Sequence, residues 1–343
     1  MRVAIASEGW PPYPIDTSIY THTRDALAAL KAVGVDAYPI PLPSNRDAKI
    51  GGLVRPFLRR ALAGYHPEPG TSIVHHVSVD AYRGADVVTV HDLAEFVAAG
   101  EFARLPDRLH RLSTRAAFRR ARRVVVTTEW TALEARRRFG RDGEKARVVP
   151  VPHPWAEPGM DREPRYDALW IGRNSPLKNL PLYLRLAEAY PGLRFALRSA
   201  KSPGREGLDH LTDGMLAGLR NVTRLPRLSE EELDRLYRSS PVLVVTSQYE
   251  GFHVPAMEAY LRGAKLVLPT IQPFLEIYGG EGGGRTPNVY WYDPRGGLTA
   301  LGGAFWEAHL ARAETPSWAV TSKVSPRSVG NALKAVYEEL VRA

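Results

Sequence analysis

Two carboxylates stand eight residues apart where an apolar strand pattern runs into a helical one. The strand covers Val242–Thr246, and the helix covers Pro255–Arg262. Glu250 therefore falls in the connecting loop, and Glu258 falls on the first turn of the helix. The amides and dipole of a helix start favour a bound anion, and a neighbouring carboxylate can hold sugar hydroxyls through paired hydrogen bonds. Without further context the simpler interpretation is that Glu258 complements the helix dipole while Glu250 is solvated.

Two cations stand five residues apart at a second junction of this kind. The strand pattern Tyr166–Ile171 is followed by Arg173, and Lys178 precedes the helical pattern Asn179–Tyr190. Both side chains can point into one cleft, where two cations suit a diphosphate. The alternative is a pair of surface cations. Because a cation at a helix start is mildly unfavourable, its position there favours a functional role.

Strand and helix patterns alternate along most of the chain, and this predicts parallel sheets with helices on both faces. Further strands are expected at Val3–Ser7, Val35–Ile40, Ser72–His75, Val87–His91, Arg123–Thr127, Arg147–Val151, Arg194–Arg198 and Lys265–Leu268. Further helices are expected at Thr17–Val33, Leu53–Ala63, Pro106–Ala121, Glu129–Phe139, Ser229–Ser239 and Ser325–Val341. Ligands of such folds bind beyond the carboxyl ends of the strands.

A proline-rich stretch near residues 150–164 interrupts the alternation, which then restarts. We therefore expect an α/β protein of two doubly wound, Rossmann-like domains facing each other across a cleft, residues 1–152 and 153–320. Residues 321–343 form a C-terminal helix that can return to the first domain.

Composition excludes several classes of protein. The chain of 343 residues is 44% hydrophobic, which suits a globular protein with real cores, and it has no cysteine, so disulfides and thiolate sites are excluded. No apolar run approaches the roughly 20 residues of a spanning helix, and the first residues indicate a strand rather than a leader peptide. We expect a cytoplasmic protein. The Asp-x-Asp metal motif and the glycine fingerprint of dinucleotide enzymes are both absent.

These segments together resemble retaining glycosyltransferases of family four, which have the GT-B fold. The pattern Glu-Gly-Phe-x-x-Pro-x-x-Glu-Ala spans residues 250–259, the Gly-Arg turn and lysine lie within 168–179, and a strand ends in His-Asp within 87–93. The match is strong from about 166 to 280 and looser before 150. Two departures stand out. The loop after the first strand has one glycine only, and His253 stands where the family commonly has glycine.

The resemblance implies a retaining, metal-independent transfer of a hexose from UDP- or GDP-hexose to a hydroxyl acceptor, with no cofactor and no metal ligand. It implies that Glu250 and His91 hold the sugar while Arg173 and Lys178 stabilise the leaving diphosphate. Glu258 would hold the ribose, and the loop containing Leu225 would flank the base. The complete donor-binding set implied is Arg173, Lys178, Gly251, Phe252, His253, Val254, Glu258 and Leu225.

Positive charge is concentrated in one segment. The net charge is +9, and residues 104–123 contain eight arginines against one acidic residue, Asp107. Leu105, Leu109, Leu112 and Ala116 recur at helical spacing, with arginines on the other face. Such a helix can lie on an anionic membrane surface, so the protein can be peripheral to the inner face of a membrane. The plainer alternative is a core-facing helix with a solvated arginine face. No aromatic side chains interleave the arginines, which disfavours nucleic acid as a partner.

Two other classes stay open: an epimerase or phosphorylase acting on the same fold, and a non-catalytic sugar-nucleotide-binding protein. The residue types do not reveal the sugar, the base, the acceptor or the oligomeric state.

Overall fold

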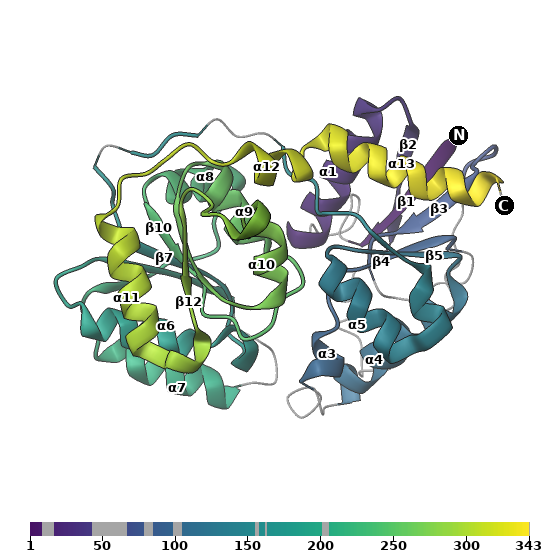
Figure 1. The fold of residues 1–343 in the computed structure, drawn as a ribbon. Helices are drawn as coiled ribbons and strands as arrows, with labels where there is room; N and C mark the ends of the chain where they lie inside the picture. Colours follow the sequence, from purple (N-terminus) through teal and green to yellow (C-terminus); the bar gives the residue numbers. More distant parts are fainter. Residues whose placement is uncertain are drawn as a thin grey trace. The chain divides into compact units, whose positions relative to one another are not determined.

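The computed structural model describes residues 1–8, 17–42, 67–78, 85–98, 105–154, 158–161, 163–200 and 206–342. The chain divides into two compact units: unit 1 is Met1–Pro154 with Ser322–Ala343, and unit 2 is Trp155–Thr321. Each unit contains a six-stranded sheet whose paired neighbours all run parallel (Figure 1). The predicted fold class, two doubly wound α/β domains, is confirmed.

The sheet of unit 1 has the strand order β2-β1-β3-β4-β5-β6. Its strands are β1 (Arg2–Glu8), β2 (Asp36–Leu42), β3 (Ile73–His76), β4 (Val87–Val90), β5 (Arg123–Val126) and β6 (Ala146–Val148). Its helices are α1 (Thr17–Ala32), α3 (Ala94–Val97), α4 (Leu105–Arg120), α5 (Glu129–Phe139) and α13 (Pro326–Arg342), with 3₁₀ turns η2 (Gly140–Lys145) and η6 (Ser322–Val324). The predicted helix Leu53–Ala63 lies outside the described residues.

The sheet of unit 2 has the order β12-β11-β10-β7-β8-β9. Its strands are β7 (Ala168–Arg173), β8 (Phe195–Ala200), β9 (Val222–Arg224), β10 (Val242–Val244), β11 (Lys265–Pro269) and β12 (Val289–Tyr292). Its helices are α6 (Leu180–Ala189), α7 (Glu206–Ala217), α8 (Glu230–Arg238), α9 (Val254–Leu261), α10 (Gln272–Tyr278), α11 (Gly297–Leu310) and α12 (Trp318–Thr321), with turns η3 (Pro176–Lys178), η4 (Glu281–Gly283) and η5 (Pro294–Gly296). The order reverses between β7 and β10, and such a reversal opens a crevice at the carboxyl ends of the strands.

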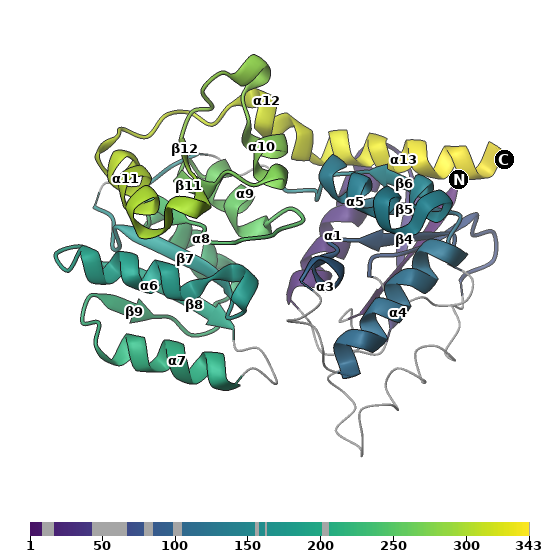
Figure 2. The same ribbon diagram turned by 60° about the horizontal axis from the view of Figure 1, so that its bottom comes forward.

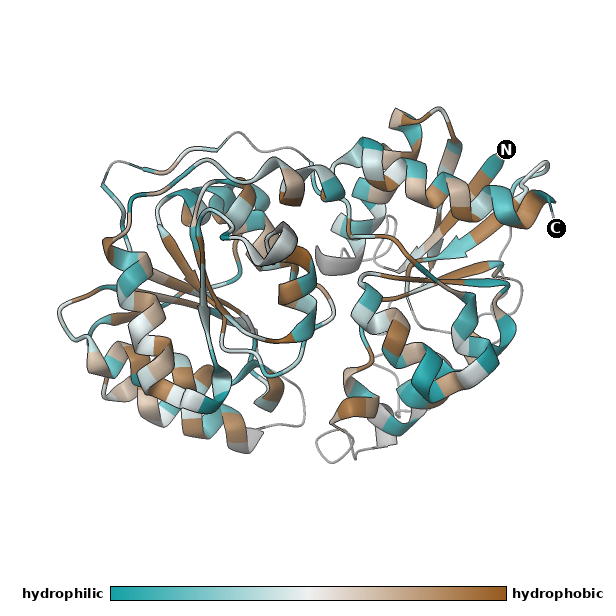
Figure 3. Cartoon of the chain, in the orientation of Figure 1, coloured by the Kyte–Doolittle hydropathy of each residue, from teal (hydrophilic) through white to brown (hydrophobic). Residues whose placement is uncertain are grey.

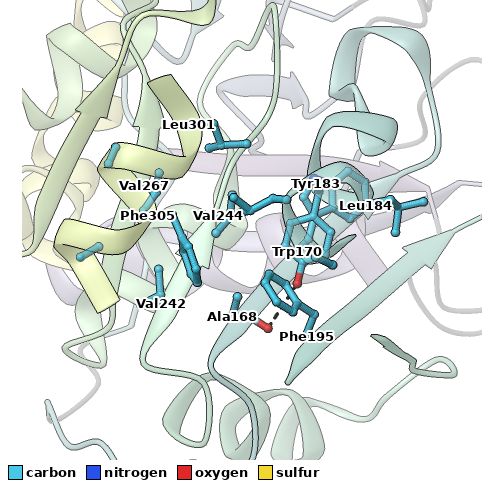
Figure 4. Close-up of a cluster of buried hydrophobic side chains, with 14 of the residues drawn as sticks. Ala168, Trp170, Tyr183, Leu184, Phe195, Val242, Val244, Val267, Leu301 and Phe305 are labelled. Atoms are coloured by element: carbon cyan, nitrogen blue, oxygen red, sulfur yellow. Dashed lines mark hydrogen bonds between the residues drawn. The ribbon is translucent and has the colours of Figure 1, made fainter. Parts of the chain in front are cut away.

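A buried aromatic cluster fixes β7 and β8 against α6 (Figure 4). Trp170, Tyr183 and Phe195 are each at most 2% exposed. The Tyr183 hydroxyl donates to the backbone carbonyls of Ala168 and Ala196, at 3.2 and 2.8 Å, so its one polar atom is satisfied within the core. This cluster holds rigidly the strands whose ends carry the predicted phosphate-binding residues.

In unit 1 the C-terminal helix α13 packs along α1 (Figure 1). Gly330 makes this close approach possible, because a Cβ at that position would lie 2.2 Å from the carbonyl oxygen of Ala29. The Tyr337 hydroxyl reaches Nδ1 of His75 at 2.7 Å, and the other ring nitrogen contacts Thr89 at 2.8 Å. Helix α13 is therefore tied to β3 and β4 by a buried polar chain.

The arginine-rich helix α4 differs from its predicted pattern. Leu112 is 56% exposed, whereas the buried positions are Ser113, Thr114, Ala117 and Phe118. Leu112 therefore does not face the core as the plainer alternative expects, and Ala117 and Phe118 pack against β5 and α5 instead. Figure 3 colours much of α4 and α5 as hydrophilic, whereas the strands of the unit 1 sheet are coloured mostly as hydrophobic.

Helices α7 and α11 and strand β12 were not predicted, and β9 was expected to be loop. Helix α11 contains three glycines, which lower helix propensity. One of them, Gly302, allows the hydroxyl of Tyr190 to approach, since a Cβ there would lie 3.3 Å from it. Strand β9 has three residues, too few for a period-two pattern.

Candidate active site

The loop after β7 carries the two predicted cations. Arg173 ends the strand and is exposed. The chain then makes the turn η3, which ends at Lys178, and Asn179 takes a left-handed conformation with φ of 48° before α6 begins. The predicted helix Asn179–Tyr190 is thus shorter at both ends. The kink at Asn179 separates Lys178 from the helix and fixes where its side chain starts.

The loop after β10 is joined to the loop after β7 by two hydrogen bonds. The hydroxyl of Thr246 donates to the Lys178 carbonyl at 2.7 Å, and the Gln248 amide donates to the Leu177 carbonyl at 2.7 Å. Trp170 Nε1 donates to the same threonine oxygen at 3.0 Å. These bonds place the two predicted site segments side by side at the point where the strand order reverses.

Glu250 is buried and paired with Lys178. Its Oε1 lies 2.5 Å from Lys178 Nζ, with the glutamate side chain 7% exposed and the lysine side chain 25% exposed. Burial alone would raise the pKa of Glu250, but the charge and hydrogen bond of Lys178, helped by His253 and Ser247, hold it below its ordinary value. Glu250 is therefore an ionised hydrogen-bond acceptor at neutral pH, and the interpretation of a solvated Glu250 is wrong.

His253 caps helix α9 instead of facing a ligand. It has φ of 65°, a conformation in which glycine is at ease and histidine is strained. Its Nδ1 accepts a hydrogen bond from the Ala256 amide at 3.1 Å, which compensates for part of that strain. Burial lowers the pKa of His253 to about 4, so the ring is neutral, with its proton on Nε2, 3.7 Å from Glu250 Oε1.

This cap reduces the number of backbone N–H groups at the start of α9 that can bind an anion. The Ala256 amide is engaged by His253, and Pro255 has no N–H group. Of the predicted helix-start amides, those of Gly251 and Val254 are left as candidates. The side chain of Phe252 is 5% exposed, so it supports the loop from within.

Glu258 lies on the second turn of α9, one residue further along the helix than expected. Its Oε2 accepts a hydrogen bond from the Tyr237 hydroxyl of α8 at 2.6 Å. Arg262 stacks over the Tyr237 ring at 5.2 Å and bonds Asp234 at 2.6 Å. Tyr237 and Arg262 therefore fix the rotamer of Glu258. Leu225, half-buried, follows β9 at the same edge of the sheet.

His91 follows β4 in unit 1. Its Nε2 lies 3.1 Å from the Val77 carbonyl, and its ring contacts His22 edge-on with centroids 4.9 Å apart. Burial lowers the pKa of His91, although Val77 and Asp92 partly oppose this, so the ring is neutral at pH 7. Because Nε2 donates to the carbonyl, Nδ1 carries the lone pair. Asp92 starts α3 by accepting the Ala94 amide at 2.9 Å.

The structure thus brings Lys178, Glu250 and His253 into direct contact and places Arg173, Leu225 and Glu258 at the same edge of the unit 2 sheet. Sequence reasoning missed the positioning roles of Thr246 and Tyr237. Thr246 ends the predicted strand Val242–Thr246. A hydroxyl that directly follows buried apolar residues needs a hydrogen-bond partner, and this requirement could have indicated its positioning role. Nothing in the sequence marks Tyr237, because its bond to Glu258 joins two different helices.

In the part of the chain that the structure describes, no cluster of three or more histidine or acidic side chains is arranged to hold a metal ion. Across the same residues, no helix is both long enough and apolar enough to cross a membrane.

The sequence was compared with protein-family models and with curated proteins. No family model matches the chain. A D-inositol 3-phosphate glycosyltransferase of Mycolicibacterium gilvum (strain PYR-GCK) is 29% identical over 187 residues, which are 51% of this chain and 41% of that protein. The match thus spans about two fifths of the length of this curated relative.

Solved structures resemble the whole chain. Sucrose-phosphate synthase from Thermosynechococcus elongatus has a TM-score of 0.68 at 18% identity, covering 100% of this chain and 98% of that one. Anabaena Alr3699/HepE, solved in complex with UDP-glucose, has a TM-score of 0.67 at 13% identity, with 100% of both chains covered. At these identities the likeness shows the fold. The chain therefore has the GT-B fold of glycosyltransferases, and about half of it is similar in sequence to a curated glycosyltransferase.

Proposed function

We propose that this chain is a glycosyltransferase that moves a hexose from UDP- or GDP-hexose to a hydroxyl acceptor, with retention at the anomeric carbon and without a metal ion. The observation that supports it most is the buried Lys178–Glu250 pair beside the exposed Arg173, at the switch point of the unit 2 sheet. A cation for a phosphate and an acceptor for a sugar hydroxyl then stand in contact at the place where α/β folds bind ligands.

In the proposed reaction the bond from the anomeric carbon to the diphosphate oxygen breaks, and a bond to the acceptor oxygen forms. The negative charge that develops on the diphosphate is stabilised by Lys178 and Arg173. The proton of the acceptor hydroxyl leaves with the reaction, and a diphosphate oxygen can take it. Glu250, kept ionised by Lys178, accepts a hydrogen bond from a sugar hydroxyl and so orients the donor.

Two further residues complete the proposed donor site. Glu258, held by Tyr237, accepts from the ribose hydroxyls. His91 of unit 1 is neutral, and its Nδ1 can accept a hydrogen bond from a sugar hydroxyl. The remaining members of the donor set act through the backbone of residues 251–254 and through the loop at Leu225.

The acceptor side of the proposal includes an anionic membrane surface. Helix α4 exposes four arginines and Leu112 to solvent. Two more arginines of the basic segment are already engaged: Arg122 donates to the Leu340 carbonyl at 2.7 Å, and Arg123 pairs with Glu339 at 2.9 Å. The membrane-facing charge is therefore smaller than the eight arginines of the segment suggest.

A transfer assay tests the proposed function. The full chain is incubated in EDTA with UDP- or GDP-hexoses, UDP-glucose first, and a panel of hydroxyl acceptors. We expect acceptor-dependent release of nucleoside diphosphate and an axial anomeric bond in the product, matching the donor. Glu250→Gln should lower the rate by on the order of 100-fold, as loss of a positioning hydrogen bond does. Glu307→Gln, on the exposed face of α11, is the matched control.

Donor turnover that is the same with and without every acceptor would contradict transfer and favour an epimerase. A complete lack of turnover together with a lack of nucleotide binding would favour a non-catalytic scaffold.

A further inference from the structure

Arg198 lies at the same sheet edge as the proposed donor site but has no role in it so far. It stands near the end of β8, which lies between β7 and β9 (Figure 2). In the pairing of β7 with β8, Arg198 is opposite Ile171, and Ile171 lies two residues before Arg173 on β7. Leu197 faces the core cluster on the α6 side, so the alternation of a strand directs Arg198 to the opposite face, toward α8.

The guanidinium of Arg198 makes no hydrogen bond and no ion pair with any described residue, and its Nε is buried without a partner. A partly buried cation without a partner is unfavourable, because it loses hydration and gains nothing in return. Other arginines of unit 2 are paired: Arg194 with Asp167 at 3.3 Å, and Arg224 with Asp213 at 2.6 Å. Arginines of unit 2 for which the described residues supply no partner, such as Arg173 and Arg185, are exposed to water, whereas Arg198 is partly buried. Its unpaired, partly buried state points to a partner that comes from outside the chain.

The neighbours of Arg198 indicate which part of a nucleotide it would meet. Arg224 is opposite Leu197 in the register, and the Leu225 amide donates to the Leu197 carbonyl at 2.8 Å, so Leu225 lies next to Arg198. On the other side, the charge of Arg198 acts on the hydroxyl of Tyr237, which holds Glu258. Arg198 therefore lies between the position proposed for the base and the position proposed for the ribose.

A guanidinium has five hydrogen-bond donors and no acceptor. Uracil presents carbonyl oxygens, and guanine presents O6 and N7, all of them acceptors, whereas adenine places an amino donor at the position of the guanine carbonyl. We propose that Arg198 selects the base of the donor by donating hydrogen bonds to a carbonyl oxygen of uracil or guanine, so that the site favours UDP- or GDP-sugars over ADP-sugars. This inference rests on the proposed function and goes beyond it, because it assigns base selection to one side chain.

The test is calorimetric titration of UDP, GDP and ADP into the full chain and into Arg198→Met, which keeps an unbranched apolar stem but removes the hydrogen-bond donors. In the wild type, UDP or GDP should bind at least about tenfold more tightly than ADP. Arg198→Met should weaken the preferred nucleotide by about ten- to a hundredfold and leave ADP within a factor of two. Arg224→Met, on the neighbouring strand and exposed, is the matched control and should change none of the three.

The possible results distinguish a failure of base selection by Arg198 from a failure of the proposed function. Equal weakening of all three nucleotides in Arg198→Met would mean a phosphate contact and would overturn base selection, as would no change or a wild-type preference for ADP. Should Arg198→Met fail to fold, Arg198→Leu carries the same comparison, since leucine is apolar and also has no hydrogen-bond donor. Loss of UDP or GDP preference in that variant supports the inference, and retention overturns it. Failure of the wild type to bind any nucleotide would instead contradict the proposed function, and base selection with it.

Discussion

Replacing Lys178 with methionine removes the cation from a buried ion pair and leaves the Glu250 carboxylate without its main partner. Breaking a buried pair in this way costs about 3–5 kcal/mol. Because the Lys178 side chain is 25% exposed, water offsets part of the loss, and we expect the lower end, about 3 kcal/mol at pH 7. Urea unfolding followed by circular dichroism measures this as a shift of the unfolding midpoint.

The pH dependence of this loss has a definite sign. The folded-state pKa of Glu250 is lowered, so its contribution to stability is present above its unfolded pKa of about 4.5 and is lost as the pH falls through the folded value. In Lys178→Met the burial of Glu250 is no longer opposed by the lysine, so its pKa rises and the carboxyl can be protonated. The difference in unfolding free energy between wild type and variant should therefore shrink from pH 7 to pH 4.

A double variant and a control complete this experiment. Lys178→Met with Glu250→Gln should regain most of the lost stability, because no unpaired charge is left buried. Arg295→Met removes an exposed partner of Asp293 in the same unit and should leave the unfolding midpoint nearly unchanged, because an exposed ion pair is screened by water. Equal unfolding midpoints of Lys178→Met and wild type at pH 7, or a double variant as unstable as the single one, would refute this reasoning.

Three further perturbations test other parts of the structure. Gly172→Ala places a Cβ 2.8 Å from the Trp170 ring, so it should destabilise unit 2 by about 1–3 kcal/mol and weaken nucleotide binding through the displaced loop, as urea unfolding and calorimetry would show. Tyr337→Phe leaves a ring nitrogen of the buried His75 unpaired and should cost about 1–3 kcal/mol by urea unfolding. Replacing the four exposed arginines of α4 with serine, at positions 108, 115, 119 and 120, should weaken binding to anionic vesicles by roughly 1 kcal/mol per arginine. Cosedimentation with the vesicles measures this loss.

Each of these has its own control. Gly214→Ala lies in α7 with open space around the added carbon and should be neutral or stabilising, so an equal loss there would contradict the Trp170 clash. Tyr190→Phe loses a half-buried hydroxyl bond at 3.3 Å and should cost less than Tyr337→Phe. Vesicles of neutral lipid are the control for α4, and equal cosedimentation of wild type and variant with anionic vesicles would remove the membrane from the proposal.

The pattern of strands and helices predicted the fold well because both units are built from parallel strands buried on both faces. Such strands appear as short apolar runs, such as Val87–Val90 and Val242–Val244. The elements that were missed lack this signal. Strand β9 is three residues long, and α11 contains three glycines, of which Gly302 lies against Tyr190, a residue distant in the sequence.

The residues of the candidate site were predictable, but their contacts were not. The position of Lys178 before a helix and of Glu250 after a strand could be read from the sequence. Their pairing depends on β7 and β10 being neighbours in the sheet, and the spacing of residues along the chain does not determine the order of the strands. The capping role of His253 depends in the same way on a left-handed backbone that the sequence favours only weakly at a histidine.

Calorimetric titration of UDP and GDP in EDTA, into the wild type and into Arg173→Ala with Lys178→Ala, tests most directly whether unit 2 holds a nucleoside diphosphate. The wild type should bind one of them, and saturation at 100 times the dissociation constant should stabilise the chain by about 2.7 kcal/mol. The double variant should bind neither, because both cations for the diphosphate are gone. Equal affinity of the double variant and the wild type, or no binding by the wild type at millimolar nucleotide, would contradict the placement of the donor site at the carboxyl edge of this sheet.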